Sequence, residues 1–212
     1  MHALTRESLY SAITHGIGIP LSLAGTYILM QRAFTFGTPW HMAGFLIFGI
    51  TMLHVYTSST LLHSSTSMKW GPRFELLDYL GIYLFIAGSY TAFIFIGLRN
   101  NLGWTMLAIV WLMAIIGIAL TFWGWFTKYR LLTTYYYVAM GVFTLLFIQP
   151  FMQIIPLMGV MWLILGDLLY IIGTFFFMWK SLRYHHAIWH LFVLGGSICH
   201  FVVLNNFLLW VK

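Results

Sequence analysis

The sequence predicts an all-α integral membrane protein built as a bundle of seven transmembrane helices. Hydrophobic residues make up 61% of the 212 residues and charged residues only 7%, whereas soluble domains carry about 25% charged residues. Apolar stretches of roughly 20 residues, long enough for a helix to cross a bilayer, recur along the whole chain. Because they leave no room for a soluble domain, we expect residues 1–212 to form a single transmembrane domain.

Glycines, prolines and charged clusters separate the apolar stretches and set the approximate limits of the seven spans. The expected spans are residues 8–30, 40–62, 76–98, 102–126, 133–152, 157–179 and 186–210. The first span is too long for a cleavable signal peptide, lacks a strongly basic start and is followed by no small-residue cleavage site. We therefore expect it to be the first transmembrane helix.

Basic residues predict the orientation, because cytoplasmic loops of membrane proteins carry an excess of lysine and arginine. With seven spans, seven basic residues fall on the side of the N-terminus: Arg6, Lys69, Arg73, Lys128, Arg130, Lys180 and Arg183. The other side carries Arg32, Arg99 and Lys212. We therefore expect the N-terminus inside and the C-terminus outside. The net charge of +6 lies in membrane loops rather than in a solvated patch, which favours membrane lipids over nucleic acid as partners.

Three histidines at the ends of predicted spans point to a metal site. His186 and His190 begin the last span four residues apart, so they share one helix face. His63 ends the second span, one turn after Ser59, and the topology places it on the same cytoplasmic side as Asp78. Buried polar side chains are costly in lipid, and three neutral imidazoles with an open fourth position are familiar in catalytic zinc sites. We therefore expect zinc as the cofactor.

The acidic residues number only four, so each is informative. Asp78 is the candidate for chemistry, since a carboxylate beside a metal can hold or deprotonate a water molecule. Glu75 is expected to be a solvated partner of Arg73. Asp167 falls near the middle of the sixth span, where an ionised carboxylate is costly unless it is paired or faces a water cavity.

Two further histidines lie well inside predicted spans. We interpret His15 and His200 as core histidines whose hydrogen bonds are satisfied. His200 lies almost four helical turns beyond His186, so the alternative is that it lines a polar cavity above the metal site.

Several short motifs occur together: Ser59-x-x-x-His63, Asp78 leading to Gly81, the run Ala87-Gly88-Ser89-Tyr90-Thr91, His186-Ala-Ile-Trp-His190-Leu-Phe-Val, and near the start Glu7 with Thr14-His15-Gly16-Ile17-Gly18. Together they resemble the haemolysin III proteins, the bacterial branch of the progestin and adipoQ receptor family. The resemblance covers essentially the whole chain. It implies seven helices in a bacterial plasma (inner) membrane, the N-terminus inside, and zinc on His63, His186 and His190. It also implies that Asp78 and Ser59 contact the water at the metal or support it from further out.

The chain departs from the family pattern at three positions. Tyr10 stands where the family tends to have asparagine, and Ala92 replaces a usual proline. Asp167 follows Gly166 where a pair of glycines is expected. None of these positions is an expected zinc ligand.

Three functions fit the sequence. The first is a zinc-dependent hydrolase of acyl-lipid amides or esters within the membrane, with Asp78 as the base and Ser59 orienting the water. The second is a non-catalytic, zinc-stabilised sensor or regulator of bilayer fluidity, because bacterial family members are implicated in membrane homeostasis. The third is pore formation. It is disfavoured because the chain has too few charged residues to form a ring that lines an ion pore.

Overall fold

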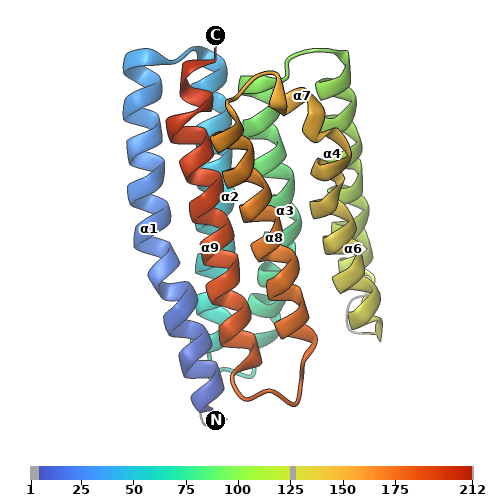
Figure 1. The fold of residues 1–212 in the computed structure, drawn as a ribbon. Coiled ribbons are helices and arrows are strands. Elements are labelled where there is room, and N and C mark those ends of the chain that lie inside the picture. Colours follow the sequence, from blue (N-terminus) through green and yellow to red (C-terminus); the bar gives the residue numbers. More distant parts are fainter. Residues whose placement is uncertain (1–4, 125–127, 212) are drawn as a thin grey trace.

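Long helices form along the apolar stretches, because a chain in lipid must satisfy its backbone hydrogen bonds internally. The computed structural model describes residues 5–124 and 128–211, and the long helices lie side by side (Figure 1). They are α1 (Arg6–Phe36), α2 (Pro39–Ser64), α3 (Gly71–Gly97), α4 (Asn101–Phe122), α8 (Leu157–Met178) and α9 (His185–Asn206), the last extended by the short 3₁₀ helix η2 (Leu208–Trp210). Among the described residues, these six segments are long and apolar enough to cross a membrane.

The expected fifth span, residues 133–152, is helical but divided. It consists of α6 (Arg130–Val142), the 3₁₀ helix η1 (Phe143–Phe147) and the short α7 (Ile148–Met152). Pro150 accounts for the change in winding, because its ring has no N–H and would clash with the carbonyl of residue 146 in a regular α-helix. A continuous helix was therefore the wrong expectation for this segment.

The other expected limits agree with the helices to within a few residues, and α1 is longer at both ends. Thr5 caps α1 by accepting a 3.0 Å hydrogen bond from the backbone N–H of Ser8. Residues 125 and 126, at the end of the expected fourth span, and Lys212 lie outside the described residues.

Seven of the ten basic residues belong to one end of the bundle. Helix α1 begins at this end, α4 ends and α6 begins there, and the α2–α3 and α8–α9 connections lie there too, whereas α9 ends at the opposite end (Figure 1). The seven basic residues assigned to the N-terminal side lie in or beside these segments, as expected. Glu75 pairs here with Arg130 at 3.5 Å, not with Arg73 as expected. Residues two apart on a helix point in different directions, which explains the error.

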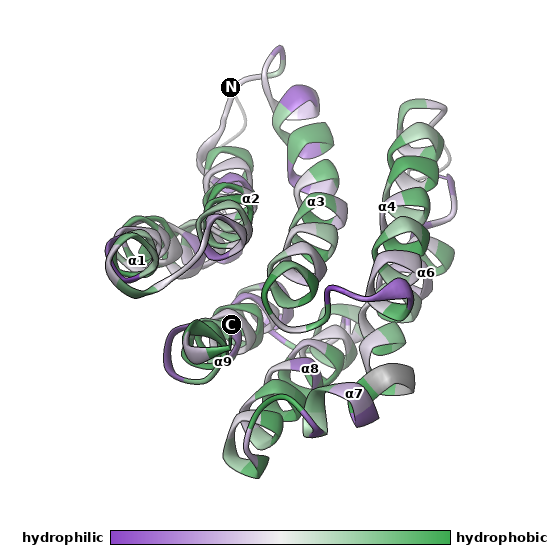
Figure 2. Cartoon of the chain, turned by 90° about the horizontal axis from the view of Figure 1, so that it is seen from above, coloured by the Kyte–Doolittle hydropathy of each residue, from purple (hydrophilic) through white to green (hydrophobic). Residues whose placement is uncertain are grey.

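Helix α3 lies between α2 and α4, and α9 lies between α1 and α8, when the bundle is viewed from above (Figure 2). One apolar core joins α1, α2, α3, α8 and α9, and includes Phe45, Phe48 and Leu204. A second core joins α3, α4 and α6 around Val110 and Met140. Large apolar side chains remain exposed on the outer helix faces, among them Leu23, Leu112 and Met161. In a multi-pass membrane protein these faces contact lipid.

Candidate metal centre

Three histidine side chains from two helices converge at the end of the bundle where α1 begins. His63 lies in the last turn of α2, while His186 and His190 occupy the first two turns of α9. The Nε2 atoms of His63 and His186 are 3.1 Å apart, and one ring nitrogen from each of the three residues lies within 4.8 Å of the others. Nitrogens bound tetrahedrally to zinc at 2.0–2.1 Å would be roughly 3.3 Å apart. We call these residues the His triad, and its donor set fits zinc.

Hydrogen bonds from α1 fix the orientation of the His190 ring. Its Nδ1 lies 3.1 Å from the backbone carbonyl of Ser11 and 3.2 Å from the Thr14 hydroxyl. The Thr14 hydroxyl itself donates to backbone carbonyls of α1, so the proton between the two residues belongs to Nδ1 of His190. Nε2 consequently carries the lone pair. It is buried and has no hydrogen-bond partner among the described residues, as expected of a nitrogen prepared to bind a metal.

His15 also belongs to this region, which sequence reasoning missed. Its ring stacks on His190 with centroids 3.4 Å apart and planes inclined by 19°. It is almost fully buried, yet neither ring nitrogen has a hydrogen-bond partner among the described residues. The expectation of a satisfied core histidine was therefore wrong. The sequence did contain a signal for this role. His15 follows Thr14 in the N-terminal motif Thr14-His15-Gly16-Ile17-Gly18, which is part of the family resemblance.

Ser59 and Asp78 are neighbours, both buried, on the facing helices α2 and α3. The Ser59 hydroxyl lies near the Asp78 carboxyl, but no hydrogen bond joins the two. Ser59 lies one turn before His63, and Asp78 lines the same cavity as His186. The structure thus brings all five expected site residues to one end of the bundle. The roles of Asp78 and Ser59 in chemistry stay predictions.

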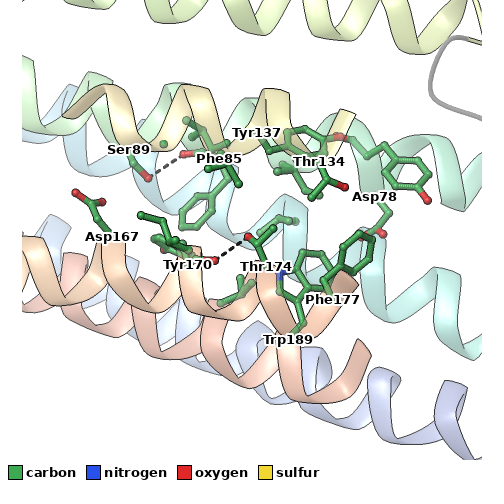
Figure 3. Close-up of a pocket in the computed structure, with 18 of the residues that line it drawn as sticks. Asp78, Phe85, Ser89, Thr134, Tyr137, Asp167, Tyr170, Thr174, Phe177 and Trp189 are labelled. Carbon is green, nitrogen blue, oxygen red and sulfur yellow. Dashed lines mark hydrogen bonds between the residues drawn. The ribbon is translucent and has the colours of Figure 1, made fainter. Parts of the chain in front are cut away.

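A large cavity leads away from the His triad into the bundle. Its volume is about 510 Å³, and α3, α6, α8 and α9 supply most of its walls. Asp78 and Asp167 lie at opposite ends of it, with Phe85 and Tyr170 among the residues between (Figure 3). On α9 the lining extends from His186 to His200, which is about 21 Å along a helix. One leaflet of a bilayer has about 15 Å of hydrocarbon, so the cavity is long enough for an acyl chain.

A second, polar cavity also borders the triad, at His63 and His186. Its volume is about 270 Å³, and it is lined by Thr5, Glu7, Ser8, Ser11, His63, Lys180, His185 and His186. Oε1 of Glu7 lies 3.5 Å from Nε2 of His185. Burial, together with the nearby Arg130, lowers the pKa of Lys180 below its ordinary value. Lys180 and His186 border both cavities, so a polar and an apolar space meet at the triad.

The start of α9, which positions His186, follows an unusual backbone conformation. Tyr184 has φ 61° and ψ 21°, a left-handed conformation that a non-glycine residue adopts at a cost of about 1–3 kcal/mol. The ring of Tyr10 packs edge-on against Tyr184, with centroids 4.9 Å apart. The first departure from the family pattern thus supports the turn that leads into the triad. At the second departure, Ala92 is buried and α3 continues through it unbroken.

Asp167 lies beside His200, a partner that the sequence does not identify. Its Oδ1 lies 3.3 Å from Nε2 of His200, and both residues are buried. Gly166 allows this approach, because a Cβ atom there would lie 2.6 Å from the His200 ring. His200 lines the large cavity, as in the second of its two expected placements, but the walls of this cavity are mainly apolar rather than polar.

Comparison with known proteins shows the family of this chain. The family model for "Haemolysin-III related" proteins matches residues 3–201. The chain is 42% identical to "Hemolysin-3 homolog" of Bacillus subtilis (strain 168) over 92% of each chain. It is 41% identical to "Hemolysin-3" of Bacillus cereus over 95% of this chain and 91% of the relative. It is also 27% identical to the human "Monocyte to macrophage differentiation factor" over 95% of this chain and 84% of the relative. The chain therefore belongs to the haemolysin III family, the bacterial branch of the progestin and adipoQ receptor superfamily.

Proposed function

We propose that this protein is a zinc-dependent hydrolase of acyl-lipid amides or esters in a bacterial plasma membrane. The observation that carries the proposal is that a polar and an apolar cavity meet at the His triad, with His186 bordering both. A lipid hydrolase needs this arrangement, because water and an acyl chain must reach the same atoms from different sides.

Each residue of the site has its own role in the proposed reaction. His63, His186 and His190 would hold zinc, which supplies Lewis acidity toward a carbonyl oxygen and lowers the pKa of water. The apolar cavity would hold the acyl chain and exclude water from it. Asp78, which lines this cavity close to the triad's end, would accept the proton of the attacking water, and Ser59 would orient that water.

The topology belongs to the same proposal. Six helices cross the membrane, and α6, η1 and α7 together supply a seventh crossing with the N-terminus inside and the C-terminus outside. Support comes from Figure 1, where α6 begins at the same end as α1 and α7 ends at the other. A divided helix is tolerated at membrane depth where other helices cover it, and α6 and α7 contact α3, α4 and α8.

The second candidate function is a zinc-stabilised regulator of membrane fluidity without catalysis. It is favoured by the contacts through which the triad region ties three helices together, since His190 of α9 bonds to α1 and His63 comes from α2. Pore formation, which the names of two relatives suggest, has less support. Asp167, the acidic residue deepest in the described helices, is paired with His200 rather than part of a charged ring.

Parallel zinc and product measurements on Asp78→Asn separate these functions. The substitution keeps the side-chain size but removes the charge. A hydrolase retains its zinc and loses fatty-acid release from N-acyl amides or acyl esters in vesicles by about 100- to 10,000-fold. Glu75→Gln is the matched control, since it removes an acidic group at the outer end of the same helix, and its activity should equal the wild type.

Each other outcome has a distinct meaning. Zinc lost with Asp78→Asn would make Asp78 a ligand or a structural support. Product release unchanged by Asp78→Asn would remove Asp78 from the mechanism. Wild-type protein that carries zinc but releases fatty acid from neither class of lipid would contradict the hydrolase and favour the regulator.

A further inference from the structure

A second group of polar side chains lies at the end of the large cavity remote from the triad. Asp167 of α8 and His200 of α9 are 7% and 6% exposed, respectively. Ser89 and Tyr90 of α3 and Thr144 line the same cavity, and Figure 3 places Ser89 with Asp167, away from Asp78. The apolar cavity therefore has polar groups at both ends.

One oxygen of this group has an unfilled hydrogen-bond requirement. Oδ2 of Asp167 is buried and has no partner among the described residues. The nearby hydroxyls use their protons elsewhere: Ser89 donates to the carbonyl of Phe85, Tyr90 to that of Met140, and Thr144 to the Tyr90 hydroxyl. An unpaired buried carboxylate oxygen is costly. The group that completes it must be a hydrogen-bond donor that enters through the cavity.

We infer that Asp167 and His200 form a subsite for a hydroxyl group at the far end of a lipid chain. The inference rests on the proposed function in one respect, that the head of this chain lies at the His triad. Oδ1 of Asp167 lies 3.3 Å from Nε2 of His200, which leaves Oδ2 as the oxygen without a partner among the described residues. Nδ1 of His200 also has no partner among the described residues, and a hydroxyl can both donate and accept.

The cavity walls between the two polar ends indicate the chemistry of the middle part of the ligand. They are formed mainly by apolar and aromatic side chains, including Ile82, Ile86, Phe93 and Val193. The part of the ligand between its head and its hydroxyl is therefore hydrocarbon. Because the lining of α9 covers about 21 Å, the hydroxyl belongs near the chain's terminus. The ligand class is a long acyl chain hydroxylated at or near its ω end.

The subsite is separate from the zinc chemistry, because no residue of the His triad contributes to it.

Binding of two ladders of fatty acids to the zinc-loaded, full-length protein in detergent tests the subsite. One ladder is unsubstituted and the other carries an ω-hydroxyl, and affinities are measured by native mass spectrometry at each chain length. For short chains the hydroxyl should weaken binding, because it meets apolar walls. At the length that reaches Asp167 it should strengthen binding by about tenfold or more, the value of a hydrogen bond to a charged group.

Substitutions at Asp167 test whether this residue causes the gain in affinity for the ω-hydroxylated acids. Asp167→Leu should abolish the hydroxyl preference while binding of the unsubstituted acid stays the same or improves. Asp167→Asn, which keeps one acceptor oxygen and serves if the leucine variant fails to fold, should reduce the preference. Thr174→Val is the matched control, because Thr174 lines the middle of the cavity and donates to the carbonyl of Tyr170. It should keep the preference.

The outcomes also separate this inference from the proposed function. Unsubstituted acids that bind without any ω-hydroxyl gain at any length would overturn the subsite and leave the hydrolase standing, with water as the partner of Asp167. A gain that persists in Asp167→Leu would overturn it too. If neither ladder binds, the acyl cavity of the proposed function and the subsite both fail.

Discussion

The backbone carbonyl of Ser11 on α1 lies 3.1 Å from Nδ1 of His190 on α9. This contact joins the first and last long helices of the chain and turns the free nitrogen of His190 toward His63 and His186. The Thr14 hydroxyl, 3.2 Å from the same atom, adds a second acceptor. Partners of this kind tune the affinity of a metal-binding imidazole.

Thr14→Val should therefore lower the affinity for zinc by about tenfold, the low end of the usual range for such partners, because the Ser11 carbonyl remains. The measurement is a competition titration with a chromogenic zinc chelator. Thr26→Val is the control, since Thr26 lies on the same helix and likewise donates to a backbone carbonyl, that of Ser22. Equal affinities for the two variants would show that Thr14 does not support His190.

Gly18 allows α1 to approach α2, and its replacement should destabilise the bundle. A Cβ atom at Gly18 would collide with the ring of Tyr56, which cannot move freely because its hydroxyl donates to Ser197 at 2.8 Å. Gly18→Ala should lower the free energy of unfolding by about 1–3 kcal/mol, measured by denaturation in detergent.

Gly16 offers the matched comparison for Gly18. A Cβ atom there would lie 3.8 Å from Thr60, an ordinary contact. Gly16→Ala should be neutral or stabilise by up to about 1 kcal/mol, through helix propensity. If both variants lose the same stability, close packing at Gly18 is not the cause.

The orientation predicts where reporter fusions are active. A fusion after the C-terminus should report the outside, because seven basic residues lie at the end of the bundle where α1 begins. A fusion in the turn between α2 and α3, around residues 65–70, should report the cytoplasm. A reporter at the C-terminus that is active in the cytoplasm would contradict the proposed seven crossings. It would also contradict the assignment of the triad to the cytoplasmic side.

The sequence predicts the long helices well because their limits depend on local composition. It also predicts the meeting of His63, His186 and His190, because topology places residues at a common depth and helical spacing sets their facing. The division of the fifth span before Pro150 was missed, because apolar character alone does not reveal the loss of a backbone donor at proline.

Contacts between helices were harder to predict. The stacking of His15 on His190 and the pairing of Asp167 with His200 depend on which helices are neighbours and on how each is rotated. Neither property follows from the period of one helix. The exchange of partner at Glu75 has the same origin, because Arg130 comes from a different helix.

Zinc content of the purified protein tests the central claim most directly. The wild type should contain about one zinc ion per chain, and alanine at His63, His186 or His190 should remove it. His54→Ala, on the same helix as His63 but outside the triad, should keep the wild-type content. A wild-type protein without zinc, or full zinc occupancy in all three triad variants, would contradict the account.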